Sequence, residues 1–505
     1  MLPRLAAVQK WLLMGTAMFV MVWAVIRACL QSMTFDEAFT YQNFTRTMEQ
    51  VEKFNTNNHF LNSLLIYVTT HVLGTSTFSV RLPALLGAAV YVSVCYLVCQ
   101  RLTDRFSVRL ALFICLSFNP FIFDFMAAAR GYSLANAFLM AALAVPILFR
   151  DDRAGALGNA CVWASIALGL SFASNLSFAF VDGMAFLGIA GWAMNRREGE
   201  SAVRLLGCCS LPGILVAGLI CGYPLAHLPM KGFKDDFWWG AHSLKEMKDS
   251  LVQASLFQVK PENLGWFYKV GTFLRRLGLV SLGVVCVVRY LAVALDGSWR
   301  HNARVRWISG IALMVAGIGL GSLGLSWLAF HFYGLPLPMG RTGIYFAPLV
   351  TLLAGMAAAA PATNAVSLWI RRGTSLVLIA VAFYFVLCLR LSYFKEYQRE
   401  ADIKEAYSVV DKLNRTYGVM DFQVNGIYVS ALNFYREVSK EEVFPEFRLE
   451  MPETSPGRSV YVMDGIYWRD FIQREKLAVV YKGKFSELVV VVKPDGPVPA
   501  TPVEP

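Results

Sequence analysis

Two adjacent carboxylates, Asp36 and Glu37, follow a hydrophobic run about as long as one membrane crossing. They lie in the stretch SMTFDEAFTYQNF, residues 32–44, so the bilayer surface is only a few residues away. Anchoring a helix requires no acidic pair at this position. A carboxylate there can act as a general base toward an acceptor hydroxyl, and basic side chains nearby can stabilise a departing phosphate. The pair therefore predicts chemistry at a membrane surface.

The elements that must position such a pair are membrane helices. The chain has 505 residues, of which 56% are hydrophobic and only 16% are charged, whereas soluble proteins carry about 25% charged residues. Long apolar runs alternate with short basic links, a pattern typical of a polytopic α-helical membrane protein. The first run is too long for a cleavable signal and lacks a small-residue cleavage site, so we interpret it as a retained signal anchor.

Eleven membrane crossings are predicted, and the charges of the links orient them. Basic residues concentrate in the links that face inside if the N-terminus is inside, as the positive-inside rule requires. The net charge of +11 is therefore a topology signal and not a nucleic-acid site. The ten cysteines all fall in apolar runs, which favours packing roles over disulfides or zinc binding. The predicted spans are 11–30, 82–99, 108–123, 131–149, 157–174, 177–194, 204–225, 277–295, 305–330, 343–360 and 374–392.

The sequence divides into a membrane domain over 1–393, an extracytoplasmic α/β domain over 394–493 and a disordered tail over 494–505. Residues 59–74 are apolar but short, and we interpret them as an interfacial helix within a first outer loop, 31–81. A second large outer loop covers 226–276. In the α/β domain, residues 397–418 predict an amphipathic helix, whereas 424–435, 458–468 and 477–493 predict strands.

Five short motifs occur in order along the membrane domain, and together they resemble a known family. They are Asp36-Glu37, Asn58-His59-Phe60-Leu61, Arg81-Leu-Pro, Arg130-Gly-Tyr132 and Arg341 with Tyr345. In this order the chain resembles the GT-C membrane glycosyltransferases, in particular the branch of protein O-mannosyltransferases and lipid A aminoarabinose transferases. Two positions depart from that pattern. The second motif lacks the family's prolines, and Ala128 stands where many members have an acidic residue, so that Asp124 is the nearest carboxylate.

The resemblance implies a glycosyltransferase that moves a sugar from a polyprenyl-phosphate donor to an extracytoplasmic glycan, lipid or protein acceptor. Asp36 would be the general base, and one displacement would invert the anomeric centre. Glu37 would shape the loop or bind a cation, and Asp124 is a candidate second acid. Candidates for binding the donor phosphate are the basic and aromatic residues of the predicted outer face: Arg341, Tyr345, Arg130, Tyr132, Lys231, Arg275 and Arg276.

The remaining candidates have structural alternatives. Arg81 is expected to fix the first loop through hydrogen bonds, and His59 either supports the loop or helps Glu37 to hold a metal. Asp182 lies near the outer end of a span, where an unpaired carboxylate is costly. No cofactor is expected to be required, although a divalent metal stays open. The alternatives to an enzyme are a transporter or flippase and a non-catalytic binder of a lipid-linked glycan. The compact loops favour a bacterial inner membrane, with the site on the periplasmic side.

Overall fold

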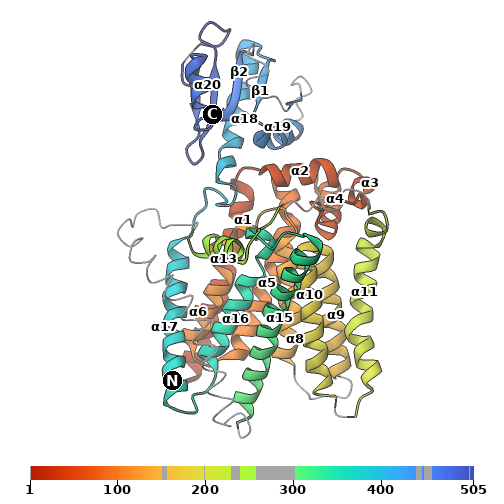
Figure 1. The fold of residues 1–505 in the computed structure, drawn as a ribbon. Coiled ribbons are helices and arrows are strands. Elements are labelled where there is room, and N and C mark those ends of the chain that lie inside the picture. Colours follow the sequence, from red (N-terminus) through yellow and green to blue (C-terminus); the bar gives the residue numbers. More distant parts are fainter. Residues whose placement is uncertain are drawn as a thin grey trace.

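The structure is a computed structural model that describes residues 2–149, 156–197, 199–228, 239–257, 302–439, 446–448, 458–499 and 501–504. A bundle of long helices carries a layer of short helices at one end, and a small α/β domain stands above that layer (Figure 1). We call this end of the bundle the domain face. The other end, where the N-terminus lies, is the opposite face.

The bundle confirms the predicted polytopic helical class, but not the number of eleven crossings. Within the described residues, seven helical stretches are long and apolar enough to cross a membrane: Ala7–Leu30, Thr77–Leu102, Ala156–Ser174, Leu176–Met194, Ala202–Ala226, Ala303–Tyr333 and Ala365–Leu387. The predicted spans 108–123, 131–149 and 343–360 correspond to shorter apolar helices, and 277–295 lies outside the described residues. The helices of the bundle are α1 (Leu2–Leu30), α5 (Thr77–Leu102), α6 (Phe106–Ser117), α8 (Tyr132–Leu148), α9 (Ala156–Ser174), α10 (Ala179–Met194), α11 (Ala202–Ala226), α15 (Ala303–Tyr333), α16 (Phe346–Ala359) and α17 (Ala365–Leu387).

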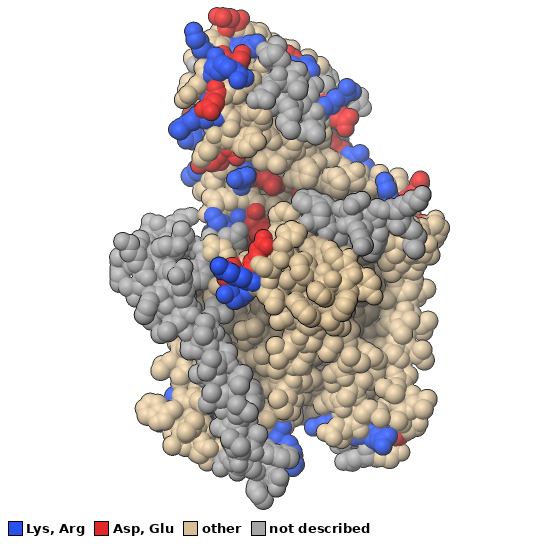
Figure 2. Space-filling model, viewed as in Figure 1, with Lys and Arg blue, Asp and Glu red and all other residues tan. Residues whose placement is uncertain are grey.

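Small residues let the helices of the bundle approach closely, as is common between membrane helices. A Cβ atom added at Gly169 of α9 would lie 2.4 Å from the carbonyl oxygen of Gly213 in α11. One added at Gly87 of α5 would lie 2.8 Å from the backbone nitrogen of Leu134 in α8. In the space-filling view, the visible middle of the bundle is nearly free of charged side chains, whereas blue side chains gather near the opposite face (Figure 2).

Two of the shorter helices begin next to irregular turns. Helix α6 ends at Ser117, and Asn119 then caps the short helix α7 (Pro120–Phe125), whose proline stands at the start of the helix, where no backbone donor is needed. Similarly, the 3₁₀ turn η4 (Gly340–Gly343) comes just before α16. Asp124 lies in α7, just beyond the predicted span 108–123, and Arg341 lies in η4, just before the predicted span 343–360.

The layer on the domain face consists of α2 (Phe35–Phe44), α3 (Met48–Glu52) and α4 (Phe60–Leu73). Helix α4 corresponds to the short apolar segment 59–74 and packs against α5. All three helices lie across the end of the bundle (Figure 1). The first predicted outer loop is therefore helical, and its start is held directly beneath the α/β domain.

The α/β domain contains a four-stranded sheet in the order β1-β2-β4-β3. Strand β1 (Phe422–Val424) is parallel to β2 (Val460–Asp464), whereas β4 (Leu488–Val492) is antiparallel to both β2 and β3 (Ala478–Lys482). Alternate strand residues point to opposite faces. Helices α18 (Ile403–Tyr417) and α19 (Gly426–Ser439) pack on one face, and α20 (Arg469–Arg474) packs on the other.

The predicted strand over 424–435 was wrong, because only its first residue belongs to β1 and residues 426–435 lie in α19. Aromatic and β-branched residues favour a strand there, but Tyr428, Leu432 and Tyr435 recur at helical spacing and are buried in the core of the domain. The described residues of the end, 494–499 and 501–504, were expected to be disordered. In the structure Val498 is buried, and the backbone nitrogen of Val503 donates to the carbonyl oxygen of Val480 at 2.8 Å.

One hydrophobic core joins the α/β domain to the layer beneath it. Met33, Ala38, Tyr41 and Ile66 of the layer pack in the same cluster as residues of α18, α19 and the sheet. The domain is therefore not a separate body on a flexible linker. It is packed onto the segment that begins with the acidic pair.

Candidate functional site

Helix α2 begins at the acidic pair because its first turn is capped. The hydroxyl of Thr34 accepts from the backbone nitrogen of Glu37 at 3.2 Å, and a carboxylate oxygen of Glu37 accepts from the backbone nitrogen of Thr34 at 3.0 Å. This capping box satisfies two backbone donors at the helix start. It also fixes Asp36, which lies between the two partners, at the exposed side of the first turn.

Asp36, Arg341 and Tyr397 form a triangle of short contacts. Nη1 of Arg341 lies 2.6 Å from Oδ2 of Asp36, the hydroxyl of Tyr397 donates to the same oxygen at 3.0 Å, and Arg341 Nη1 also donates to that hydroxyl at 3.0 Å. The three residues come from α2, η4 and the segment after α17. The side chains of Asp36 and Arg341 are 20% and 19% exposed, so the ion pair is partly accessible to solvent.

A second guanidinium lies beside Asp36. Arg130, which precedes α8, donates from Nη1 to the hydroxyl of Thr40 at 2.7 Å and to the backbone oxygen of Asp36 at 3.4 Å. Burial alone would raise the pKa of Asp36, but the charges of Arg130 and Arg341 and the hydrogen bonds from Tyr397 and Arg341 outweigh it and lower this pKa below its ordinary value. The carboxylate is therefore ionised at neutral pH in the unliganded protein.

Glu37 points away from this triangle and is completely buried. Its two oxygens accept from Nε and Nη2 of Arg81 at 2.8 and 2.7 Å, and one also accepts from the backbone nitrogen of Ala129 at 2.7 Å. Together with the backbone nitrogen of Thr34, four donors therefore contact the carboxylate. Arg81 in turn donates to the backbone oxygens of Ala28, Gln31 and Ser32. This geometry gives both residues a role in fixing the loop.

Asp124 also lies in a structural network. It accepts from Arg27 of α1 at 2.5 Å, from Arg390 after α17 at 2.8 Å and from the backbone nitrogen of Lys395 at 2.7 Å. The carboxylate is buried and joins three segments that are distant in sequence. Within the described residues no direct contact joins Asp124 to Asp36, and its observed contacts form a clamp between these segments.

His59 and Tyr132 contact each other, with their ring centroids 5.4 Å apart. Burial, followed by the charges of Arg130 and Arg341, lowers the pKa of His59 well below its ordinary value, so the ring is neutral. Its Nε2 has no hydrogen-bond partner within the described part of the chain. The described residues hold no cluster of three metal-binding side chains, and Glu37, which was considered together with His59, is paired with Arg81.

The other predicted residues fall elsewhere. Tyr345 is fully buried, with its ring 5.2 Å from that of Phe178. Asp182 is buried within the bundle and accepts from the hydroxyl of Ser171 at 2.9 Å. Lys231, Arg275 and Arg276 lie outside the described residues, as does most of the predicted loop 226–276. The structure thus brings together Asp36, Arg130 and Arg341.

Sequence reasoning missed Tyr397, Glu400 and Trp239, all of which lie at this site. Glu400 accepts a short hydrogen bond from the backbone nitrogen of Phe35, and burial together with the charges of Asp36 and Glu37 raises its pKa to about 8. The ring of Trp239 lies 5.9 Å from the guanidinium carbon of Arg341, within cation–π range. The only sequence signal for Tyr397 and Glu400 was their place directly after the last predicted span.

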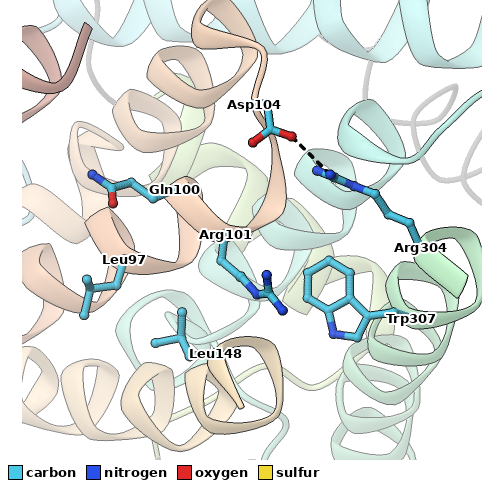
Figure 3. A pocket seen from close by; sticks show the side chains of 7 residues that line it. All are labelled: Leu97, Gln100, Arg101, Asp104, Leu148, Arg304 and Trp307. Carbon is cyan, nitrogen blue, oxygen red and sulfur yellow. Dashed lines mark hydrogen bonds and ion pairs between the residues drawn. The ribbon is translucent and has the colours of Figure 1, made fainter. Parts of the chain in front are cut away.

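A separate cavity of about 560 Å³ lies at the opposite face and does not belong to this site. Arg101 and Trp307 stack across it at 5.2 Å, and Arg304 forms an ion pair with Asp104 at 3.0 Å (Figure 3). The cavity is lined by Leu97, Gln100, Arg101, Asp104, Leu148, Arg304 and Trp307.

Comparisons with known proteins bear on the fold. No protein-family model and no curated protein sequence matches this chain. ArnT from Cupriavidus metallidurans bound to undecaprenyl phosphate is similar in structure, with a TM-score of 0.51 and 14% sequence identity over 96% of this chain and 98% of that chain. The apo state of ArnT gives 0.50 and 12% with the same coverage. Arabinosyltransferase EmbB from Mycobacterium smegmatis gives 0.40 and 11% over 85% of this chain and 42% of that chain.

The likeness to ArnT extends over nearly the whole length of both chains. It confirms the fold that the resemblance to the GT-C family implied. The chain has the fold of ArnT, with apolar helices below and an α/β domain above. At such low identity the likeness establishes the fold alone.

Proposed function

We propose that this protein is an integral membrane glycosyltransferase. It transfers a sugar from a polyprenyl-phosphate donor to an extracytoplasmic glycan, lipid or protein acceptor. The observation that carries the proposal is the partly exposed Asp36 carboxylate paired with Arg341, with Arg130 donating to the backbone oxygen of the same residue, at the domain face of an ArnT-like fold. The presence of undecaprenyl phosphate in one ArnT structure supports a lipid-linked donor.

The residues present suffice for a one-step displacement. Asp36 takes the proton of the acceptor hydroxyl while the acceptor oxygen forms a bond to the anomeric carbon. The bond between that carbon and the phosphate oxygen breaks, and its electrons leave with the polyprenyl phosphate. Arg341 and Arg130 stabilise the charge that develops on the phosphate, because a guanidinium presents a fixed fork of donors to phosphate oxygens. A single attack from the opposite side inverts the anomeric centre.

Donor binding would also prepare the base. In the unliganded protein, Arg341 is paired with Asp36 and contributes to its lowered pKa. A phosphate that takes over this guanidinium weakens its pairing with the carboxylate. The pKa of Asp36 then rises towards a value better suited to accepting a proton. The ion pair is therefore the resting form of a site whose arginine moves its contact from the carboxylate to the phosphate.

The proposal requires no metal, because the two guanidinium groups supply the positive charge that a divalent ion would provide. It places the domain face on the extracytoplasmic side, in a bacterial inner membrane. A lipid-linked donor suits this site, because its phosphate would lie at the membrane surface near α2 while its tail stays among the apolar helices of the bundle.

The test uses the purified full-length protein with a panel of radiolabelled polyprenyl-phosphate sugars and membrane extract as acceptor. Wild type should release polyprenyl phosphate and transfer label. Asp36→Asn should lose at least about 100-fold in rate, the usual scale for a general base. Asp104→Asn is the matched control, because Asp104 lies at the opposite face and its side chain is 82% exposed. Release from no donor by wild type, or equal transfer by Asp36→Asn, would overturn the proposal.

A further inference from the structure

The segment that leads from α17 to α18, residues 388–402, contributes directly to the site. It carries Tyr397 and Glu400, which contact the first turn of α2 at two adjacent residues. The hydroxyl of Tyr397 donates to Oδ2 of Asp36 at 3.0 Å, and the carboxylate of Glu400 accepts from the backbone nitrogen of Phe35. Tyr397 is buried, and the ring of Phe125 lies 6.5 Å from its own, so the hydroxyl is held in one direction.

Tyr397 can perform a task that neither arginine can. Its hydroxyl accepts from Nη1 of Arg341 and donates to Asp36, so it bridges the cation and the base. Burial and the charge of Asp36 raise its pKa well above the ordinary value, so the phenol keeps its proton. When a phosphate draws Arg341 away, the hydrogen bond from Tyr397 remains to hold the carboxylate in place.

Glu400 acts on the backbone of α2. The amide of Phe35 is a helix-terminal donor with no partner in its own helix. The carboxyl group of Glu400, on another segment, satisfies it through an oxygen that accepts the hydrogen bond, and this contact fixes the direction in which the next residue, Asp36, leaves the helix. The side-chain cap of α2 comes from Thr34 and contacts the amide of Glu37, so Glu400 supplies a second, separate restraint.

Further contacts from the α/β domain restrain the same segment, residues 32–41. The hydroxyl of Ser32 donates to the backbone oxygen of Ala401 at 2.6 Å, and the backbone nitrogen of Met33 donates to the hydroxyl of Tyr435 at 2.7 Å. At the other end of α2, the hydroxyl of Tyr41 donates to Glu437 at 2.7 Å. The segment 32–41 is therefore held by the domain on both sides of the carboxylate.

We propose that Tyr397 and Glu400 are positioning residues for Asp36, and that the α/β domain completes the site through them rather than serving only as a separate binding module. This inference rests on the proposed function and deepens it. It assigns the domain a task in the chemical step, namely holding the base at the angle and with the hydrogen bond that proton transfer requires.

The test compares Tyr397→Phe with Tyr435→Phe, using a polyprenyl-phosphate sugar that wild type turns over. Both variants remove one hydroxyl that contacts segment 32–41, but only Tyr397→Phe removes a donor to the carboxylate. That donor helps to lower the pKa of Asp36, so the acid limb of the kcat/KM profile should move to higher pH in Tyr397→Phe and stay in place in Tyr435→Phe. The other charged or titratable groups around Asp36, which are common to both variants, are Arg130, Arg341, Glu37, His59 and Glu400.

A second pair of variants keeps the test decisive if Tyr397→Phe is not monodisperse on gel filtration. Glu400→Gln retains an acceptor for the Phe35 amide, whereas Glu400→Ala does not. We expect kcat of Glu400→Gln to stay within about threefold of wild type and kcat of Glu400→Ala to fall at least about 10-fold, with little change in the donor KM.

The possible results distinguish failure of the proposed function from failure of the roles assigned to Tyr397 and Glu400. Absence of transfer by wild type would overturn the proposed function. Active wild type with an unmoved acid limb in Tyr397→Phe would refute the role of Tyr397 and leave the function standing. Equal rates for Glu400→Gln and Glu400→Ala would do the same for Glu400.

Discussion

The buried ion pair of Glu37 and Arg81 allows a sharp prediction of stability. Both side chains are fully buried, and the carboxylate accepts four hydrogen bonds within 3.0 Å. Glu37→Gln keeps the shape but removes the charge, and the new amide group must direct two donors at groups that are already donors. The guanidinium of Arg81 is then buried without a counter-charge. Breaking such a pair from one side costs about 3–5 kcal/mol.

Replacing the partner, Arg81, should lower the free energy of unfolding by at least as much. Arg81→Gln leaves the carboxylate unpaired, and it also removes donors from the carbonyl oxygens of Ala28, Gln31 and Ser32. The double variant Glu37→Gln with Arg81→Gln no longer contains an unpaired charge. Its cost should therefore be smaller than the sum of the two single costs by on the order of 2 kcal/mol, within the range found for residues in one network.

The assay is thermal unfolding of the purified protein in detergent, followed by intrinsic fluorescence. Asp104→Asn again serves as control, because it removes an ion pair whose partners are 44% and 82% exposed and whose worth is therefore at most about 1 kcal/mol. We expect Glu37→Gln to lower the midpoint clearly and Asp104→Asn to leave it nearly unchanged. Equal midpoints for both variants, or strict additivity in the double variant, would refute the reasoning.

Two further predictions concern the same face of the protein. Gly131→Ala should reduce stability strongly, because the added Cβ atom would lie 1.9 Å from the backbone oxygen of Ser174, whereas Gly15→Ala, with open space around it, should not lower the unfolding midpoint. Glu400 has a folded pKa of about 8 against an ordinary value of 4.5, so the folded state holds an extra proton between these values and stability should fall as pH rises from about 4.5 to 8. Glu400→Gln should lack this component, and equal slopes of midpoint against pH for the variant and wild type would contradict the assignment.

The sequence predicted the membrane class, and it contained the motifs that converge on the site. Apolar runs are dictated by the bilayer, so their order is visible without a structure. Asp36 and Arg341 are 305 positions apart, but each follows or precedes an apolar run at what the charge pattern predicts to be the same face. The sequence pattern cannot show which arginine each carboxylate contacts. Asp36 and Glu37 were therefore treated as one acidic pair, although Asp36 pairs with Arg341 and Glu37 pairs with the buried Arg81.

Two elements were predicted wrongly, the strand over 424–435 and the unbroken span over 108–123, because their structure depends on features that the local pattern does not show. Segment 424–435 contains residues with strand propensity, and the decision for α19 depends on which of them the α/β core buries. The break before α7 depends on Pro120, which a continuous apolar run conceals. Asp124 is a separate case, because the sequence showed its position as a candidate second acid but not the residues that contact it. Its partners Arg27 and Arg390 come from the two ends of the membrane domain, and no local pattern indicates them.

The site combines the segment after α1 with the segment after α17, which are far apart in the sequence. For this reason the sequence did not reveal all of its residues. Helix α1 leads directly into the acidic pair, and α17 leads directly into Tyr397 and Glu400, so both segments emerge from the bundle at the domain face. Asp124 binds an arginine from each of these helix ends, which fixes the spacing between the two emerging segments. That spacing is what allows a phenol from one segment to reach a carboxylate on the other at 3.0 Å. Asp124 therefore influences the site without touching it, because it holds together the two segments that carry the base and its supports.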